Sequence, residues 1–285
     1  MGKGPGLYTD IGKKAKDLLY KDHNSDQKFS ITTQSPAAFI KFTSEIAVGI
    51  TSSGTKKGDS LLGDVSLQLK QKNITTDLKV STDNTVLITA TVDEAAPGLK
   101  SIFSFRAPDQ NSGKIELQYL HEYAGISTSM GLTQNPTVNF SAVMGTNVLA
   151  AGTDVSFDTK SGNFTKINAG LSFTKDDLVA SLTLNDKGDS VNASYYHIVN
   201  PLFNTAVGAE VNHKFSTNVN TITVGTQHSL DPLTTVKARV NSAGIANALI
   251  QHQWTPSSFF TISGEVDTKA IDKNAKVGLA LSLKP

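Results

Sequence analysis

Apolar and polar side chains alternate from about residue 27 to the end of the chain, and this pattern restricts the fold more than any other feature of the sequence. In DVSLQLK (64–70) the valine and both leucines occupy every second position, and polar residues occupy the others. The same period of two returns in ITTDLKV (74–80) and in KVGLALSL (276–283). Because successive side chains of a β-strand point to opposite faces, the pattern predicts a chain built almost entirely of strands.

Turn-forming residue pairs separate the alternating segments and divide them into hairpins. They are Ser53-Gly54, Asp83-Asn84, Ser112-Gly113, Asn135-Pro136, Ser161-Gly162, Lys187-Gly188, Asn200-Pro201, Asp231-Pro232 and Thr255-Pro256. On this basis we place nineteen strands between 27 and 284, the second of them over 38–51. No linker interrupts the series, so we expect an N-terminal segment (1–26) followed by one β-domain (27–285).

The two faces of the predicted strands differ in charge, which decides where the domain resides. The polar face carries the mid-strand lysines, arginines and carboxylates, whereas the apolar face carries essentially none. Barrels of about 16 or more strands enclose an aqueous channel, and an apolar face turned inward would line a void that no side chain fills. A charge facing lipid at the bilayer midplane costs about 2–4 kcal/mol. We therefore predict an all-β transmembrane β-barrel with its apolar face outward and its charged face lining a wet lumen.

Bulk composition fits this class and argues against several others. The mean hydropathy is −0.16, and no apolar run approaches the ~18–20 residues that a membrane-spanning helix needs. The chain has no cysteine, which excludes disulfides and thiolate metal sites. Its six histidines are scattered, and no nucleophile elbow is present, so we expect neither a metal site nor an enzyme. The N-terminus does not resemble a secretory signal peptide.

Residues 7–21 form the only convincing helical pattern. Apolar side chains recur there at helical spacing, with lysines on the opposite face. The residues themselves leave two arrangements open: a helix docked on the inner wall, or a helix lying on the bilayer surface. For the docked arrangement we expect the contacts to come from Leu7, Ile11, Ala15 and Leu18.

Basic residues outnumber acidic ones on the face assigned to the lumen. The ten basic positions are Lys41, Lys70, Lys79, Lys100, Arg106, Lys114, Lys166, Lys237, Arg239 and Lys276, and the helix adds Lys13 and Lys16. The six acidic positions are Glu45, Asp77, Glu116, Asp154, Glu210 and Glu265. Basic linings favour anions, but salt screens charge over ~8 Å, so a wide pore selects weakly. The alternative is that these residues only keep a wetted surface soluble.

Four segments resemble one known family, the voltage-dependent anion channels or eukaryotic porins, and its plant members most. They are GLYTDIGKKAKDLL (6–19), STDNTV (81–86), APGLK (96–100) and KVGLALSL (276–283). The family has nineteen strands, so our strand count is not independent of the resemblance. The resemblance implies a parallel pairing of the first and last strands and an N-terminal helix inside the lumen. It also implies a voltage-gated diffusion pore of the mitochondrial outer membrane, or of the plastid outer envelope.

The resemblance also implies partners and sites. The expected partners are membrane lipid and anionic metabolites such as ATP, ADP and phosphate, together with further copies of the chain, but not nucleic acid and no cofactor. Gly98, Leu99 and Lys100 match a stretch associated with nucleotide contact, and Lys13 and Lys21 match helix lysines suspected of meeting phosphates. An ordinary strand start with an inward lysine is the alternative for the first group. The outer-membrane sorting signal would comprise Lys276, Gly278, Leu281 and Leu283.

The chain departs from the family pattern at two places. YKDHNSDQ (20–27) stands where many animal members have a glycine-rich hinge, which puts hinge-like gating in doubt. Leu78 stands where some members have a lipid-facing acidic residue, so functions of that acid do not carry over. Two rival functions are a protein-import pore of the same architecture, which should carry acidic inward patches, and a soluble β-barrel carrier for an apolar ligand.

Overall fold

The computed structural model describes residues 4–23, 27–35, 46–57, 60–269 and 275–283. Within these residues, nineteen strands form one sheet. Their bounds are β1 Gln27–Ser35, β2 Ile46–Lys57, β3 Ser60–Gln71, β4 Ile74–Ser81, β5 Val86–Ala96, β6 Leu99–Ala107, β7 Lys114–Leu120, β8 Ala124–Gly131, β9 Thr137–Gly145, β10 Leu149–Asp158, β11 Asn163–Lys175, β12 Leu178–Asn185, β13 Ser190–Asn200, β14 Thr205–Lys214, β15 Val219–Asp231, β16 Thr234–Asn241, β17 Ile245–Thr255, β18 Ser258–Asp267 and β19 Lys276–Leu283.

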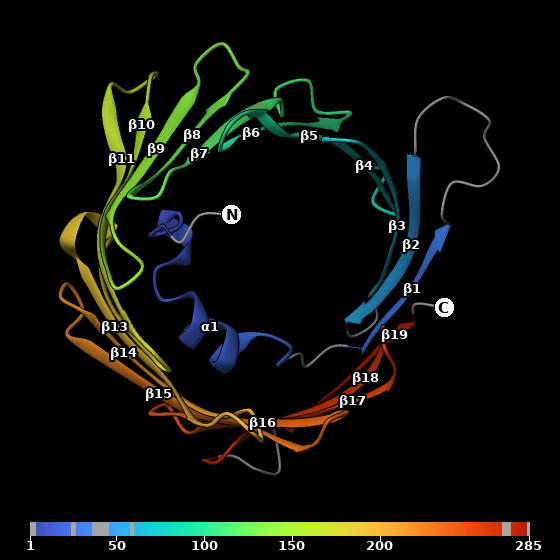
Figure 1. Ribbon diagram of the computed structural model, residues 1–285, viewed down its shortest axis with the longest axis vertical. Coiled ribbons are helices and arrows are strands. Elements are labelled where there is room, and N and C mark those ends of the chain that lie inside the picture. Colours follow the sequence, from blue (N-terminus) through green and yellow to red (C-terminus); the bar gives the residue numbers. More distant parts are fainter. Residues whose placement is uncertain (1–3, 24–26, 36–45, 58–59, 270–274, 284–285) are drawn as a thin grey trace.

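The sheet closes on itself to form a barrel around an open centre (Figure 1). Each strand pairs antiparallel with the next along the chain, but the first and last strands, β1 and β19, pair in parallel, with Phe29 opposite Leu281. Closure leaves no strand edge free to pair with another chain. The predicted all-β barrel of nineteen strands is therefore confirmed, together with its parallel closure.

The orientation of the side chains follows the predicted alternation. On β16, Lys237 and Arg239 reach the N-terminal segment inside the barrel, through Asp22 and Tyr20 respectively. The alternate residues of that strand therefore face outward, among them Val240, which is 43% exposed. Large exposed apolar side chains recur in this way on strand after strand around the barrel. The apolar belt is thus on the outside and the charged face is on the inside.

The N-terminal segment lies inside the barrel, against one side of the wall (Figure 1). It contains a 3₁₀ turn, η1 (Tyr8–Asp10), and an α-helix, α1 (Lys13–Tyr20). The prediction of a continuous helix over 7–21 is wrong, because Gly12 adopts a left-handed conformation (φ 74°) between the two pieces. Glycine takes this conformation without a steric penalty. The alternative of a helix on the bilayer surface is also wrong.

Strand β2 differs from its predicted position. The predicted turn at Ser53-Gly54 is wrong, because both residues pair within β2 with β1 on one side and β3 on the other. Hydrogen bonds to two neighbouring strands outweigh the local turn preference of a serine–glycine pair. Most of the predicted strand 38–51, including Lys41 and Glu45, lies outside the described residues. No helix in the described parts of the chain is long and apolar enough to cross a bilayer.

Candidate functional site: the lumen and its N-terminal segment

Strand glycines allow the first half of the N-terminal segment to lie directly on the wall backbone. A Cβ atom added to Gly152 on β10 would lie 3.1 Å from Tyr8 Cδ2. One added to Gly170 on β11 would lie 3.2 Å from Ile11 Cδ1. The two glycines are paired across the strands, so together they form one flat area. Glycine within a strand commonly marks such a close approach.

A second glycine pair accommodates helix α1. A Cβ at Gly208 on β14 would lie 3.1 Å from Leu18 Cδ2, and one at Gly225 on β15 would lie 2.8 Å from Leu19 Cδ2. These two glycines are also direct partners in the sheet. Leu18 and Leu19 are 3% and 0% exposed, although they lie within an open lumen. We call Gly125, Gly152, Gly170, Gly208 and Gly225 together the glycine seat, since Gly125 on β8 lies against the carbonyl of Gly6.

The glycine seat was missed by reasoning from the sequence. The period-two pattern depends on the polarity of side chains, and glycine has no side chain. The pattern therefore predicted no role for these positions. Glycines at inward positions of otherwise regular strands were the available signal. Of the four residues predicted to dock, Ala15 and Leu18 are buried, while Leu7 and Ile11 are half-buried. The most buried side chain of the segment, Leu19, was not among them.

Polar contacts hold the second end of α1. The Tyr20 hydroxyl donates a hydrogen bond to Glu210 Oε1 (3.1 Å), and the Arg239 guanidinium lies 5.0 Å from the Tyr20 ring centroid. Burial raises the pKa of the Tyr20 phenol, which therefore keeps its proton for this bond. Beyond the helix, Lys237 Nζ lies 3.8 Å from Asp22 Oδ2. The helix is thus joined to β14 and β16 by charged and aromatic groups.

Most inward lysines on the wall are paired with carboxylates. These pairs are Lys79–Asp64 (3.0 Å), Lys100–Asp93 (3.2 Å), Lys114–Glu116 (2.9 Å), Lys166–Asp154 (2.5 Å) and Lys276–Glu265 (3.3 Å). Asp64 and Asp93 were not among the six acidic positions expected in the lumen. Because they share a face with Lys79 and Lys100, the excess of positive charge on the wall is smaller than the sequence indicated.

Other predicted lumen cations differ in their surroundings. Among the described residues, neither Lys70 nor Arg106 has a carboxylate within ion-pair distance, and the same holds for Lys16 on the exposed side of α1. Lys13 forms an exposed pair with Asp10 (3.3 Å). Lys70 and Arg106 therefore contribute positive charge on the wall that is not held in an ion pair, although Asp83 lies near enough to Arg106 to interact with its charge.

The residues predicted to contact nucleotides do not form one site. Gly98 lies in the β5–β6 turn with φ 76°, Leu99 begins β6, and Lys100 is engaged by Asp93. Lys13 and Lys21 belong to the segment that packs on β13–β16, away from β6 (Figure 1). The sorting residues Lys276, Gly278, Leu281 and Leu283 all lie in β19. Their roles stay predictions.

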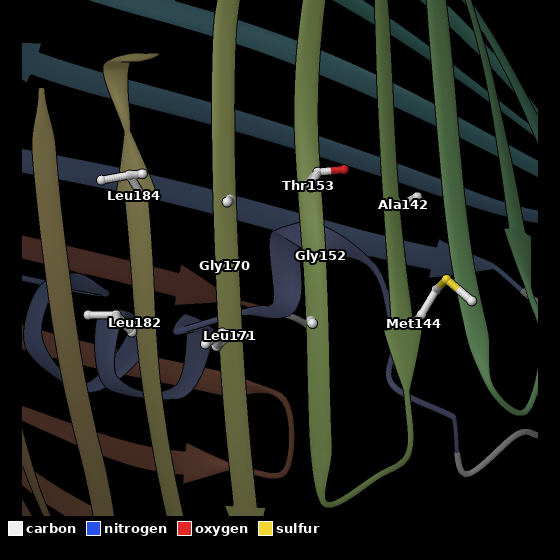
Figure 2. Close-up of a pocket in the computed structure, with 10 residues that line it drawn as sticks. Ala142, Met144, Gly152, Thr153, Gly170, Leu171, Leu182 and Leu184 are labelled. Carbon is white, nitrogen blue, oxygen red and sulfur yellow. The ribbon is translucent and has the colours of Figure 1, made fainter. Parts of the chain in front are cut away.

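Two hollows flank the wall at the N-terminal segment. A polar recess of about 480 Å³ lies between α1 and the wall, and its charged lining residues are Lys14, Asp17, Lys21, Asp22 and Lys237. An apolar groove of about 560 Å³ lies on the outer face of β9–β12 (Figure 2). Its rim includes Met144, Leu171, Leu182 and Leu184, and Gly152 and Gly170 form part of its lining (Figure 2). The same two glycines therefore thin the wall between this groove and Tyr8 and Ile11 inside.

No group of three histidine, aspartate or glutamate side chains able to hold a metal ion occurs among the described residues. The arrangement is instead that of a water-filled channel with charged walls, narrowed on one side by a docked cationic segment. Such a site acts on permeating solutes through charge and width.

Comparison with known proteins assigns the chain. The family profile of eukaryotic porins matches residues 4–278. Over 285 residues, covering all of both chains, the sequence is 82% identical to mitochondrial outer membrane protein porin 1 of Arabidopsis thaliana and 70% identical to the 34 kDa mitochondrial porin of Solanum tuberosum. An outer plastidial membrane porin of Pisum sativum is 65% identical over the same length.

Among solved structures, a triple mutant of the Rhodopseudomonas blastica porin superposes with a TM-score of 0.49 at 10% identity, covering 88% of this chain and 95% of that one. The family profile and the plant relatives, which span the whole barrel, carry the assignment. The chain belongs to the eukaryotic porin family and forms a diffusion pore of the mitochondrial outer membrane.

Proposed function

We propose that this pore is weakly selective for anions, closes partly under voltage, and passes nucleotides and phosphate. The observation that carries the proposal is a cationic segment docked inside a charged lumen without being part of the sheet. Residues 4–23 contain Lys13, Lys14, Lys16 and Lys21 against Asp10, Asp17 and Asp22, four positive charges against three negative, or a net +1.

The distribution of wall charge supports a weak preference for anions. Most wall lysines are neutralised locally by a carboxylate, so the preference depends on cations without such a partner. Arg106 on β6 is the clearest case among the described residues, since it has no carboxylate within ion-pair distance. Basic side chains lower the barrier for anions and raise it for cations. Screening over ~8 Å leaves the centre of a wide lumen little affected, so selectivity is expected to be modest.

The contacts of the N-terminal segment support voltage gating. One elementary charge moved across the full potential changes the energy by about 2.3 kcal/mol per 100 mV. A segment of net charge +1 that is held only by side-chain contacts and a flat glycine seat can be displaced by energies of this order. Displacement into the lumen would narrow the pore and alter its charge. The docked state then corresponds to the open pore.

A planar-bilayer recording across a salt gradient tests both parts. We expect a reversal potential that indicates a preference for Cl⁻ over K⁺, and a conductance that falls at both polarities as the voltage rises. Arg106→Glu should shift the reversal potential towards cations, whereas Arg106→Lys, which keeps the charge, should leave it in place. An open state that prefers cations, or a conductance that stays flat with voltage, would contradict the proposal.

The transport of nucleotides fits the same charge distribution. Phosphate groups are attracted to lysines as point charges, since an ammonium offers no bidentate fork. We propose that Lys13, Lys21 and Lys100 meet permeating phosphates only transiently. The protein-import alternative requires acidic inward patches, and Asp64 and Asp93, the two acids that the sequence count missed, each lie beside a lysine.

A further inference from the structure

His23, the last described residue of the N-terminal segment, packs on the wall. His23 Nδ1 lies 2.5 Å from Asn247 Oδ1 on β17, and Asn247 is only 3% exposed. The amide oxygen can only accept, so Nδ1 carries the hydrogen and Nε2 of the neutral ring is bare. Neither His23 Nε2 nor Asn247 Nδ2 has a hydrogen-bond partner among the described residues. The bond from Nδ1 is available to the neutral and to the protonated ring, but a proton on Nε2 would have no acceptor in the described part of the chain, so the site favours a neutral imidazole.

Among the residues that the structure describes, the two charged groups that act directly on the His23 ring are both cations. Strand β16 contributes Lys237, which is 8% exposed, and Arg239. Both already have acidic neighbours: Asp22 of the segment lies 3.8 Å from Lys237, and Glu265 of β18 lies 4.0 Å from Arg239.

Three further charged groups lie nearby but do not act as counter-ions for His23. Lys21 and Asp17, from the segment itself, add one positive and one negative charge near Lys237. Glu210 of β14 is bonded to Tyr20. A second proton on His23 would thus add a cation where the available carboxylates are engaged.

Burial lowers the pKa of His23, and the nearby Arg239 and Lys237 lower it further, while the bond to Asn247 and the backbone of Leu18 act in the opposite direction. Once the segment leaves the wall, the ring is hydrated and regains an ordinary value of about 6.5. The docked state therefore binds fewer protons than the released state. Above pH ~6.5 both states are neutral at this residue and docking is unaffected. Below it, docking weakens by up to about tenfold per pH unit until the docked ring also titrates.

We propose that His23 is a proton-operated latch: the neutral ring fastens the end of the N-terminal segment to Asn247, and protonation releases that end from the wall. The release follows from the buried contact and the two cations of β16. Its effect on conductance rests on the proposed role of the segment as the gate, whereas the movement itself does not. The latch makes the position of the N-terminal segment depend on pH. The range extends from about pH 6.5, the pKa of the hydrated ring, down to the lower pKa of the docked His23 ring.

A second histidine–asparagine pair provides a matched control. His213 Nδ1 on β14 lies 2.7 Å from Asn220 Oδ1 on β15, in an exposed position. This pair lies several residues along the two strands from Gly208 and Gly225, where α1 packs. His213 stacks edge-on against Phe215 and lies on a strand, not on the segment. Protonation there has no docked element to release.

Distance measurement tests the latch without reference to gating. The chain has no cysteine, so Lys16→Cys on the exposed side of α1 and Ser104→Cys on β6 give one spin-label pair across the lumen in liposomes. From pH 7.5 to 5 we expect a second distance population that grows below pH ~6.5. His23→Gln should remove this population at every pH, and His23→Arg should produce it already at pH 7.5. His213→Gln should behave as the parent protein.

A single distance at all pH values, or an equal shift in His23→Gln, would overturn the latch. Voltage steps on the same His23 variants without labels separate the two proposals. A distance change without any change in conductance supports the latch and counts against the segment as the gate. A conductance change with pH at a fixed distance counts against the latch.

Discussion

The wall that the N-terminal segment covers, β8–β17, differs in its inward residues from the bare wall of β1–β7. The covered wall presents the glycine seat and small residues such as Ser181 and Ser194, whose hydroxyls lie 2.6 Å apart beside Gly12. The bare wall presents ion pairs, including Lys79–Asp64 and Lys114–Glu116. The covered wall has glycines and small residues in place of large side chains where the helix packs on its backbone. The bare wall faces the water of the lumen, which solvates its charged side chains.

This difference has an energetic consequence. A glycine in the middle of a strand lowers the stability of the folded protein by about 0.5–1 kcal/mol relative to an alanine at the same position. Five glycines in the seat therefore weaken the covered strands, and the packing of Tyr8, Ile11, Leu18 and Leu19 offsets that loss. The bare wall has no such dependence on the segment. The seat and the segment therefore stabilise each other, while the bare wall, where it is described, has no contact of this kind with the segment.

The largest expected effect comes from removing the main apolar contact of the covered wall. Leu19→Ala removes a side chain that is 0% exposed and packs with Leu18 and Ala206. Such truncations cost about 2–5 kcal/mol, so protection of the α1 amides from hydrogen exchange should fall by roughly 30-fold or more. Lys16→Ala, on the exposed side of the same helix, should change it little. Equal protection in both variants would mean that the segment is not held by this contact.

A smaller effect is expected from filling the seat. In Gly208→Val the new Cβ would lie 3.1 Å from Leu18 Cδ2, while the nearest backbone atom, the Tyr195 carbonyl oxygen, is 3.7 Å away, so the helix must move away. Overpacking of this kind costs about 1–3 kcal/mol, or roughly 5- to 150-fold in the docked population. Trypsin should cleave the segment at Lys13–Lys16 correspondingly faster in liposomes.

The matched control for this substitution lies on β8. Gly131 is an inward strand glycine, paired with Lys114, and a Cβ there meets nothing within 4 Å. Gly131→Val should leave the cleavage rate unchanged. If both valines accelerate cleavage alike, the seat has no special role and the comparison between the two walls fails.

The smallest effect on stability is expected on the bare wall. Lys114→Gln breaks an ion pair of 2.9 Å whose side chains are 44% and 24% exposed. Pairs of this kind contribute about 0–1 kcal/mol, so thermal unfolding in detergent should shift little. The reversal potential should nevertheless move towards cations, because Glu116 loses its counter-charge, and Lys114→Arg should restore it. A large drop in thermal stability would show that the bare wall also depends on specific contacts.

Sequence reasoning succeeded where a pattern of side chains repeats. The alternation in DVSLQLK and its counterparts assigned strands, faces and the lumen correctly, because period two is a direct result of strand geometry. It failed at Ser53-Gly54, where pairing with β1 and β3 outweighs a local turn preference. It also failed at Gly12, since an apolar stripe does not reveal a break in the helix. Asp64 and Asp93 were missed as lumen acids, although alternation places both on the inward face.

The sequence by itself determined the barrel. Because a barrel wall has hydrocarbon outside and water inside, its strands need alternating apolar and polar side chains, and this alternation is visible at each position of the sequence. Only the tertiary structure decided where the N-terminal segment rests, that five glycines receive it, and that His23 meets Asn247 beside Lys237 and Arg239. These contacts join residues up to 224 positions apart in the chain. They depend on the curvature and register of a closed sheet, and local patterns do not encode either quantity.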